Sequence, residues 1–203
     1  MVANIGSQNK QDIDIYYPEN GVDELTYYLL EQGRRQHVPR GFTLVKEGSY
    51  SDDLFLLRRG AVKCVSTNHK GRERILVLTF EGGLVGSFLS GRLRQPCPFS
   101  VITLEESLVY GLHIHEHRDF FEYSVEGRKY VRAFTEHLAN THLMHILKEV
   151  HMSPWQRFDE LLLRVPDVLL RLSQRDVAAY IGVTPEALSR HLKSMISAPD
   201  IQY

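Results

Sequence analysis

Residues 173–193 read S-Q-R-D-V-A-A-Y-I-G-V-T-P-E-A-L-S-R-H-L-K, and this stretch decides how the carboxy-terminal part of the chain folds. Ser173 is a suitable N-cap for a first helix, and Gly182 follows that helix where the chain must turn sharply. Thr184 can cap a second helix, whose first position suits Pro185. The spacing therefore predicts two short helices joined by a tight turn, which is the helix-turn-helix arrangement.

The second of these helices carries side chains that are suited to DNA. Arg190 can donate two hydrogen bonds to the O6 and N7 atoms of guanine, and Glu186 can accept one from a cytosine amine. Ser189 suits either a base edge or a phosphate. We therefore predict a DNA-binding face that consists of Thr184, Pro185, Glu186, Ser189, Arg190 and Lys193.

Upstream of this motif, residues 118–150 are predicted to be helical almost without interruption, with Gly127 as the expected irregularity. A helix of this length cannot bury two faces against one small β-domain, so a helix of a second subunit is the natural partner. The expected interface is an apolar stripe with polar breaks, made of Val131, Phe134, Leu138, His142 and His145. The two histidines fix the register of the dimer or form a haem, metal or proton-sensing site between subunits.

The first half of the chain has the pattern of antiparallel β-structure. A short helix around Leu25 and Leu29 is followed by strands expected at residues 42–46, 53–58, 61–66, 72–80, 99–103 and 107–112, with a turn at His69-Lys70-Gly71. Residues 81–98 hold four glycines and two prolines and are predicted to be mostly loop. The pattern predicts an α+β chain: an antiparallel β jelly-roll in 1–118, a dimerisation helix in 119–151 and a helix-turn-helix unit in 152–203.

Composition excludes several classes of protein. The 203 residues include 24 Lys and Arg and 25 Asp and Glu, so there is no general basic surface and any DNA contact must be local. Two cysteines, Cys64 and Cys97, are too few for a four-thiolate cluster and could at most sense redox state. The chain shows no signal-peptide pattern and no long apolar span, which favours the cytoplasm. It also contains no P-loop, nucleophile elbow or C-x-x-C motif, so we do not expect an enzyme.

A second stretch adds a family resemblance. Residues 38–63 read V-P-R-G-F-T-L-V-K-E-G-S-Y-S-D-D-L-F-L-L-R-R-G-A-V-K, and the spacing of Gly41, Gly48 and Gly60 resembles the opening of a cyclic-nucleotide-binding β-roll. Over nearly its whole length the chain resembles the Crp/Fnr superfamily of bacterial transcription regulators. The resemblance implies an effector-sensing roll, a homodimer, and a two-fold pseudo-palindromic DNA site read by helices about 34 Å apart. It also implies RNA polymerase as a partner and, from Glu186, Ser189 and Arg190, a half-site resembling TTGAT.

The chain departs from that family at two places. Cyclic-AMP-binding members carry G-x-x-G-E and a later R-S or R-T, whereas this chain has G-L-V-G-S at 83–87 and Cys97-Pro98. A buried cyclic phosphate without a cation is costly, so we predict an effector other than cyclic AMP. Its expected pocket consists of Gly83, Gly86, Ser87, Cys97 and Pro98. Residues 194–203 are too few for the usual two-stranded wing, which indicates a short form without a full wing.

Two other functions remain open on the sequence alone. From Met152 onward there are six Lys and Arg against six Asp and Glu, so the helix-turn-helix could belong to a ligand-binding or protein-interaction module that does not bind DNA. His113, His115 and His117 alternate and would share one face of a strand, as the metal ligands of a jelly-roll metalloenzyme do. No glutamate follows at the spacing that such enzymes use, so no metal ligand is predicted.

Overall fold

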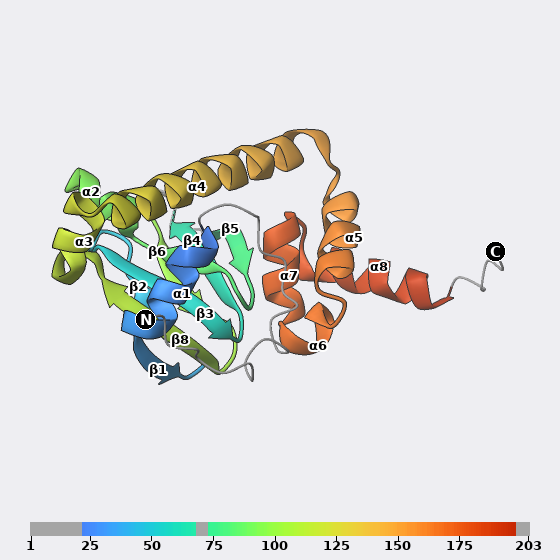
Figure 1. Ribbon diagram of the computed structural model, residues 1–203. Helices are drawn as coiled ribbons and strands as arrows, with labels where there is room; N and C mark the ends of the chain where they lie inside the picture. Colours follow the sequence, from blue (N-terminus) through green and yellow to red (C-terminus); the bar gives the residue numbers. More distant parts are fainter. Residues whose placement is uncertain (1–21, 68–72, 198–203) are drawn as a thin grey trace.

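The computed structural model describes residues 22–67 and 73–197 (Figure 1). The expected turn His69-Lys70-Gly71, the amino-terminal 21 residues and residues 198–203 lie outside the described residues. In chain order the elements are α1 (Val22–Gln32), β1 (Arg34–Val38), β2 (Thr43–Val45), β3 (Asp53–Arg59), β4 (Val62–Thr67), β5 (Glu73–Thr79), β6 (Leu84–Gly86), α2 (Phe88–Leu93), β7 (Ser100–Thr103), β8 (Ser107–His113), η1 (Ile114–His117), α3 (Arg118–Tyr123), α4 (Val125–His151), α5 (Pro154–Arg164), α6 (Val168–Arg171), α7 (Gln174–Ile181) and α8 (Pro185–Ser197).

The described strands form two four-stranded antiparallel sheets, with orders β1-β8-β3-β6 and β2-β7-β4-β5. This confirms the predicted α+β fold with an antiparallel β-roll. The sheets enclose a core that contains Phe55, Leu57, Val62 and Val109. The neighbouring β3 residues Leu54 and Leu56 point to the other face of their sheet, because successive side chains in a strand alternate. The strand segment D-L-F-L-L at residues 53–57 is therefore covered on both faces of its sheet.

Helices cover the outer face of each sheet. On the first sheet, Leu54 and Leu56 pack with side chains of α1, α3 and α4. On the second, Val65 and Ile75 pack with side chains of α5 to α8. Val65 faces this second helical layer because alternate side chains of β4 point outward. The register shift opposite Cys64 and Val65 gives β5 one extra residue, so that Ile75 and Leu78 both face the same layer. Figure 1 shows α4 running across the roll and α5 to α8 gathered beside β5.

Three regions of the chain differ from the sequence prediction. β1, which pairs with β8, was not among the predicted strands, because its polar side chains show no apolar alternation. Residues 81–98 were expected to be mostly loop, yet they contain β6 and α2. The histidines 113, 115 and 117 do not share a strand face, because β8 ends at His113 and the chain continues as the η1 turn. That expectation was wrong.

The break in the long helical region lies at Ser124 rather than at Gly127. Ser124 is extended, and its hydroxyl accepts a 2.8 Å hydrogen bond from the Gly127 amide, which caps α4. Gly127 lies in the first turn because α3 passes too close for a side chain: a Cβ there would be 2.0 Å from the Phe120 carbonyl oxygen. The glycine therefore allows α3 and α4 to pack tightly.

The inner face of α4 corrects part of the predicted dimer interface. Phe134 is 2% exposed and packs with Leu29, Leu54 and Phe121 inside the chain. Val131 and Leu138 are half-buried against the same cluster. These three residues form the seam between α4 and its own roll, because the apolar stripe that the sequence shows is matched by the outer face of the first sheet. Within the described residues no helix is long and apolar enough to cross a membrane.

Candidate nucleic-acid interface

The helix-turn-helix forms as the sequence predicts. The Ser173 hydroxyl accepts a 3.1 Å hydrogen bond from the Asp176 amide at the start of α7. Gly182 ends α7 with φ 83°, a left-handed conformation that glycine adopts without strain. The Thr184 hydroxyl then accepts a 3.2 Å hydrogen bond from the Ala187 amide and caps α8. The turn is thereby fixed at both of its ends.

Most of the predicted DNA-binding residues face outward on α8. Thr184, Pro185, Glu186, Arg190 and Lys193 are exposed, and Ser189 is half-buried. Leu188 is fully buried and anchors the opposite side of the helix in the core. In Figure 1, α8 extends away from the body of the molecule. The Glu186 carboxylate accepts hydrogen bonds from its own backbone amide and from Thr184, and these lower its pKa. The side chain is therefore an ionised hydrogen-bond acceptor at neutral pH.

Two contacts that the sequence analysis missed hold this unit in place. The Arg157 Nη2 atom donates a 2.7 Å hydrogen bond to the Ile181 carbonyl at the end of α7, and Nη1 donates to the Met152 carbonyl at 3.2 Å. The rings of Trp155 and His191 stack at a centroid distance of 4.0 Å, which ties α8 to α5. Nothing in the spacing of these residues signals the contacts, because they join separate helices.

The helix-turn-helix unit is docked on the β-roll. One apolar cluster contains both roll residues, such as Ile75 and Leu78, and helical residues, such as Val177 and Ile181. The α7 helix lies against β5. A core shared in this way fixes the position of α8 relative to the roll.

Ion pairs surround this shared core. Arg171 lies 2.5 Å from a carboxylate oxygen of both Glu81 and Glu105, and its side chain also donates to the Gly60 carbonyl at 3.2 Å. Lys63 of β4 lies 3.1 Å from Asp176 of α7. Each of these pairs joins the roll to the helical unit.

Two of the three carboxylates in these pairs, Glu81 and Asp176, are ionised at neutral pH. Burial raises the pKa of Glu81, but the hydrogen bond from Arg171, backbone hydrogen bonds and the charge of Arg171 together outweigh it, and the net shift is downward. Burial likewise opposes ionisation of Asp176, yet hydrogen bonds from Ser173 and Lys63 lower its pKa overall. A lowered pKa in the folded state means that the stabilisation is present above the ordinary pKa and is lost as the pH falls through the folded-state value.

The predicted effector residues border the core between the two sheets. Gly86 pairs with Leu54 in β3, and the Ser87 amide donates to the Asp53 carbonyl at 2.8 Å. Ser87 is 1% exposed, and among the five predicted residues its hydroxyl is a buried polar group without a hydrogen-bond partner. Cys97 is buried, with its amide and carbonyl bonded to residues 48–49, whereas Pro98 is exposed and Gly83 lies in a turn.

The cysteines are poorly placed for thiolate chemistry. Burial raises the pKa of Cys64 to about 12, with a smaller contribution from Cys97 nearby. Cys97 itself is 1% exposed. The thiol of Cys64 is therefore protonated at neutral pH, and it lacks the thiolate character on which cysteine redox sensors depend.

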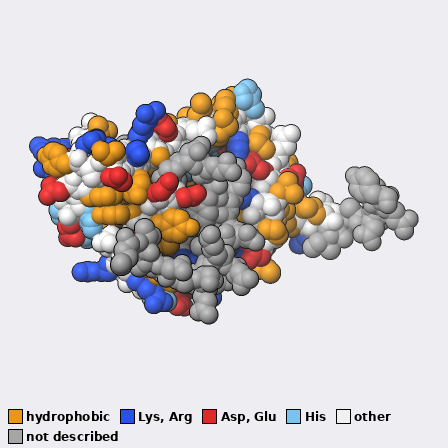
Figure 2. Space-filling model, viewed as in Figure 1, with side chains coloured by type: hydrophobic (Ala, Val, Ile, Leu, Met, Phe, Trp, Pro, Cys, Tyr) orange, Lys and Arg blue, Asp and Glu red, His pale blue; other side chains and the backbone are white. Residues whose placement is uncertain are grey.

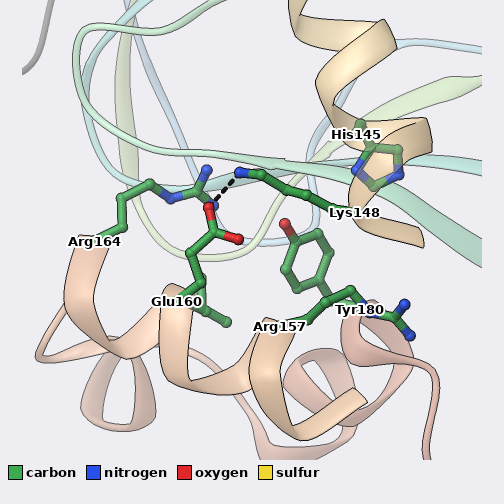
Figure 3. Close-up of a pocket in the computed structure, with 7 residues that line it drawn as sticks. His145, Lys148, Arg157, Glu160, Arg164 and Tyr180 are labelled. Carbon is green, nitrogen blue, oxygen red and sulfur yellow. Dashed lines mark hydrogen bonds and ion pairs between the residues drawn. The ribbon is translucent and has the colours of Figure 1, made fainter. Parts of the chain in front are cut away.

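Two hollows lie along α4, and neither is lined by the predicted effector residues. One lies between α4, α5 and α7, where Lys148 pairs with Glu160 beside His145 and Tyr180 (Figure 3). Its volume of about 10 Å³ holds no more than a water. His145 is half-buried and lines this hollow. The second hollow, about 320 Å³, is lined by Arg92, Phe121, Glu122, Arg128, Val131 and Arg132.

An apolar stripe is exposed on the outer face of α4, in its carboxy-terminal half. Leu143 is 52% exposed, Leu147 39% and Val150 69%, and Ile146 and Met144 extend the patch. Figure 2 shows hydrophobic side chains gathered at the upper edge of the molecule over this part of α4. At 3.6 residues per turn, the nine positions between Leu138 and Leu147 place Leu147 on the face opposite the roll. His142 is exposed nearby.

Comparison with known proteins agrees with this architecture. The cyclic nucleotide-binding domain family matches residues 35–124. The transcriptional regulatory protein btr of Bordetella pertussis is 24% identical over 189 residues, which cover 88% of this chain and 76% of that protein. FixK2 from Bradyrhizobium japonicum superimposes with a TM-score of 0.68 at 18% identity, covering 81% of this chain and 85% of FixK2. The c-di-GMP-responsive regulator CLP of Xanthomonas campestris gives 0.65 at 15% identity, covering 86% and 91%.

The fold and the matches together define a class. A cyclic nucleotide-binding-type roll is joined through a long helix to a helix-turn-helix. The chain shares this architecture with transcription regulators of the Crp/Fnr type.

Proposed function

We propose that this chain is a transcription regulator of the Crp/Fnr type, a homodimer that recognises a two-fold pseudo-palindromic DNA site through α8. Residues 1–118, 119–151 and 152–203 act as its effector, dimerisation and DNA-binding units. The observation that carries the proposal is the capped turn, which fixes α8 with Glu186, Arg190 and Lys193 exposed on one side and Leu188 buried on the other. Such a regulator works in the cytoplasm, where it meets chromosomal DNA and RNA polymerase.

The local charge supports a site-specific rather than a general attraction to DNA. Of the six cations from Met152 onward, Arg157 and Arg171 are engaged with carbonyl and carboxylate groups of the chain itself. These two side chains are therefore not available to contact phosphates, so we expect base contacts of α8 to supply a large part of the affinity.

Arg190→Ala is expected to weaken binding to the selected site by about 10- to 100-fold, because a bidentate contact to guanine contributes about 1–3 kcal/mol of discrimination. The measurement is selection from a random duplex pool at about 50 mM and about 150 mM salt, followed by titration of the recovered site. Arg118→Ala, which removes an exposed arginine of α3, is the matched control and should bind as the wild type does.

The outcome separates the two functions that the sequence left open. A recovered two-fold site whose guanine preference disappears in Arg190→Ala supports the regulator. Failure of the dimeric protein to enrich any duplex at either salt would contradict it and favour a protein-interaction role for the helix-turn-helix.

Leu147→Asp is expected to weaken the dimer by about 100-fold or more, because a buried, unpaired charge costs several kcal/mol. Leu147 lies in the exposed stripe with Leu143 and Val150, which a second copy of α4 would cover. Sedimentation velocity over a range of protein concentrations measures the change. Thr141→Asp adds the same charge at another exposed position of α4 and should remain dimeric. Equal dissociation of both variants would argue against this stripe as the interface.

The effector in this proposal is a small signal other than cyclic AMP. Ser87 is buried at the position where cyclic-AMP-binding members carry an acid, and its hydroxyl offers a neutral hydrogen-bonding group there. Addition of cyclic AMP should therefore leave the affinity for the selected duplex unchanged, which the same titration tests.

A further inference from the structure

Two carboxylates and two imidazoles meet at one end of the β3–β8 strand pair, in a place that the proposed function does not use. Asp53 and His113 are direct cross-strand partners in this pair. Asp52 comes immediately before β3, and His115 lies in η1 just after β8. The four side chains therefore come from two segments that the sheet holds next to each other.

Three potential ligand atoms lie close together, and His115 contacts one of the three residues. An oxygen of Asp52, an oxygen of Asp53 and a ring nitrogen of His113 all lie within 4.8 Å of one another. The His115 Nδ1 atom lies 3.1 Å from the Asp52 Oδ1 atom. The His113 Nδ1 atom forms an ion pair with the Asp53 Oδ1 atom, and this oxygen is buried without a further hydrogen-bond partner.

Neighbouring groups hold the two carboxylates in position. The Ser51 hydroxyl donates to the Asp53 Oδ2 atom, and the His115 amide donates to the Asp52 Oδ2 atom at 2.7 Å. Gly91 of α2 lies directly against Asp52, because a Cβ at Gly91 would be 2.2 Å from the Asp52 Cβ. Outer contacts of this kind orient metal ligands in known sites.

The burial of the four side chains leaves a route for an ion. The carboxylates of Asp52 and Asp53 are 21% and 18% exposed, whereas the imidazoles of His115 and His113 are 67% and 56% exposed. The two carboxylates thus lie deeper in the cluster, and the two imidazoles lie on its solvent side, from which an ion would enter.

We propose that Asp52, Asp53 and His113 bind a divalent first-row transition-metal ion, with Zn²⁺ as the reference case, and that His115 orients the Asp52 carboxylate. The two carboxylates balance the charge of the ion, and a mixed set of imidazole nitrogens and carboxylate oxygens is the donor set that such ions take. Mg²⁺ and Ca²⁺ favour oxygen-only sets and fit less well. Through Asp53 and His113, the bound ion connects the start of β3 to the end of β8, where η1 begins, and stabilises this end of the roll.

The test measures metal binding by the full-length protein, freed of its purification tag and of metal. Co²⁺ binding is followed by visible absorption, and Zn²⁺ binding by competition with a coloured chelator. We expect one ion per chain, and for Asp53→Asn and His113→Ala an affinity lower by about 10-fold or more. His37→Ala removes an exposed histidine of β1 and is the matched control, with wild-type affinity expected.

Each result decides the proposal. Circular dichroism checks that the variants are folded, and Asp52→Asn repeats the test from the other carboxylate. The proposal is overturned if the wild type binds Zn²⁺ no more tightly than Asp53→Asn and Asp52→Asn, or if His37→Ala abolishes binding, which would locate the metal on β1. Because no DNA is present, failure here leaves the proposed regulator function untouched.

Discussion

Phe134→Asp is expected to leave no stably folded protein. The side chain is 2% exposed and packs with α1, β3 and α3 in the cluster beneath α4. Truncation of a buried phenylalanine costs about 3–5 kcal/mol, and an unpaired buried carboxylate adds several more. The sum approaches the whole stability of a typical domain, about 5–15 kcal/mol. Soluble yield and urea unfolding at fixed protein concentration measure the effect.

The result distinguishes the inner face of α4 from its outer face. Phe134→Leu, which keeps an apolar side chain, should cost only about 1 kcal/mol and stay folded. Leu147→Asp should yield a folded monomer, because that side chain faces outward. A folded Phe134→Asp monomer with a wild-type unfolding midpoint would restore the interpretation from the sequence, in which Phe134 faces the partner.

Arg171→Glu is expected to release the helix-turn-helix unit from the roll. The substitution places a third carboxylate beside Glu81 and Glu105, and the Gly60 carbonyl loses its donor. Removing one member of a buried ion pair costs about 3–5 kcal/mol, and the partial exposure of Arg171 places the effect near the lower end. Small-angle X-ray scattering should show a larger radius of gyration, and limited proteolysis should cut faster between α4 and α5.

Arg175→Glu provides the matched comparison, because Arg175 is exposed on α7. The same change of charge at that position should preserve the compact shape. If Arg171→Glu keeps the wild-type scattering profile, the apolar cluster of Ile75, Leu78, Val177 and Ile181 holds the docked arrangement without the ion pairs.

Local signals in the sequence were enough to predict the helix-turn-helix. The caps at Ser173 and Thr184 and the left-handed Gly182 each act within a few residues, so their chemistry can be recognised without knowing what packs around them. The run of buried β3 residues was similarly visible. By contrast, β1 has no apolar alternation, and its pairing with β8 comes from a neighbour distant in the chain.

The sequence by itself determined the class of protein: an antiparallel roll, a long helix and a helix-turn-helix, because strand alternation, helical periodicity and caps are local properties. Only the tertiary structure decided which face of α4 meets the roll, since Phe134 and Leu147 are both apolar and periodicity cannot say what covers each. It also brought Arg171 to Glu81 and Glu105, and Asp53 to His113, across 60 to 90 residues of chain. Such contacts depend on the packing of whole sheets and helices, which no short stretch of sequence encodes.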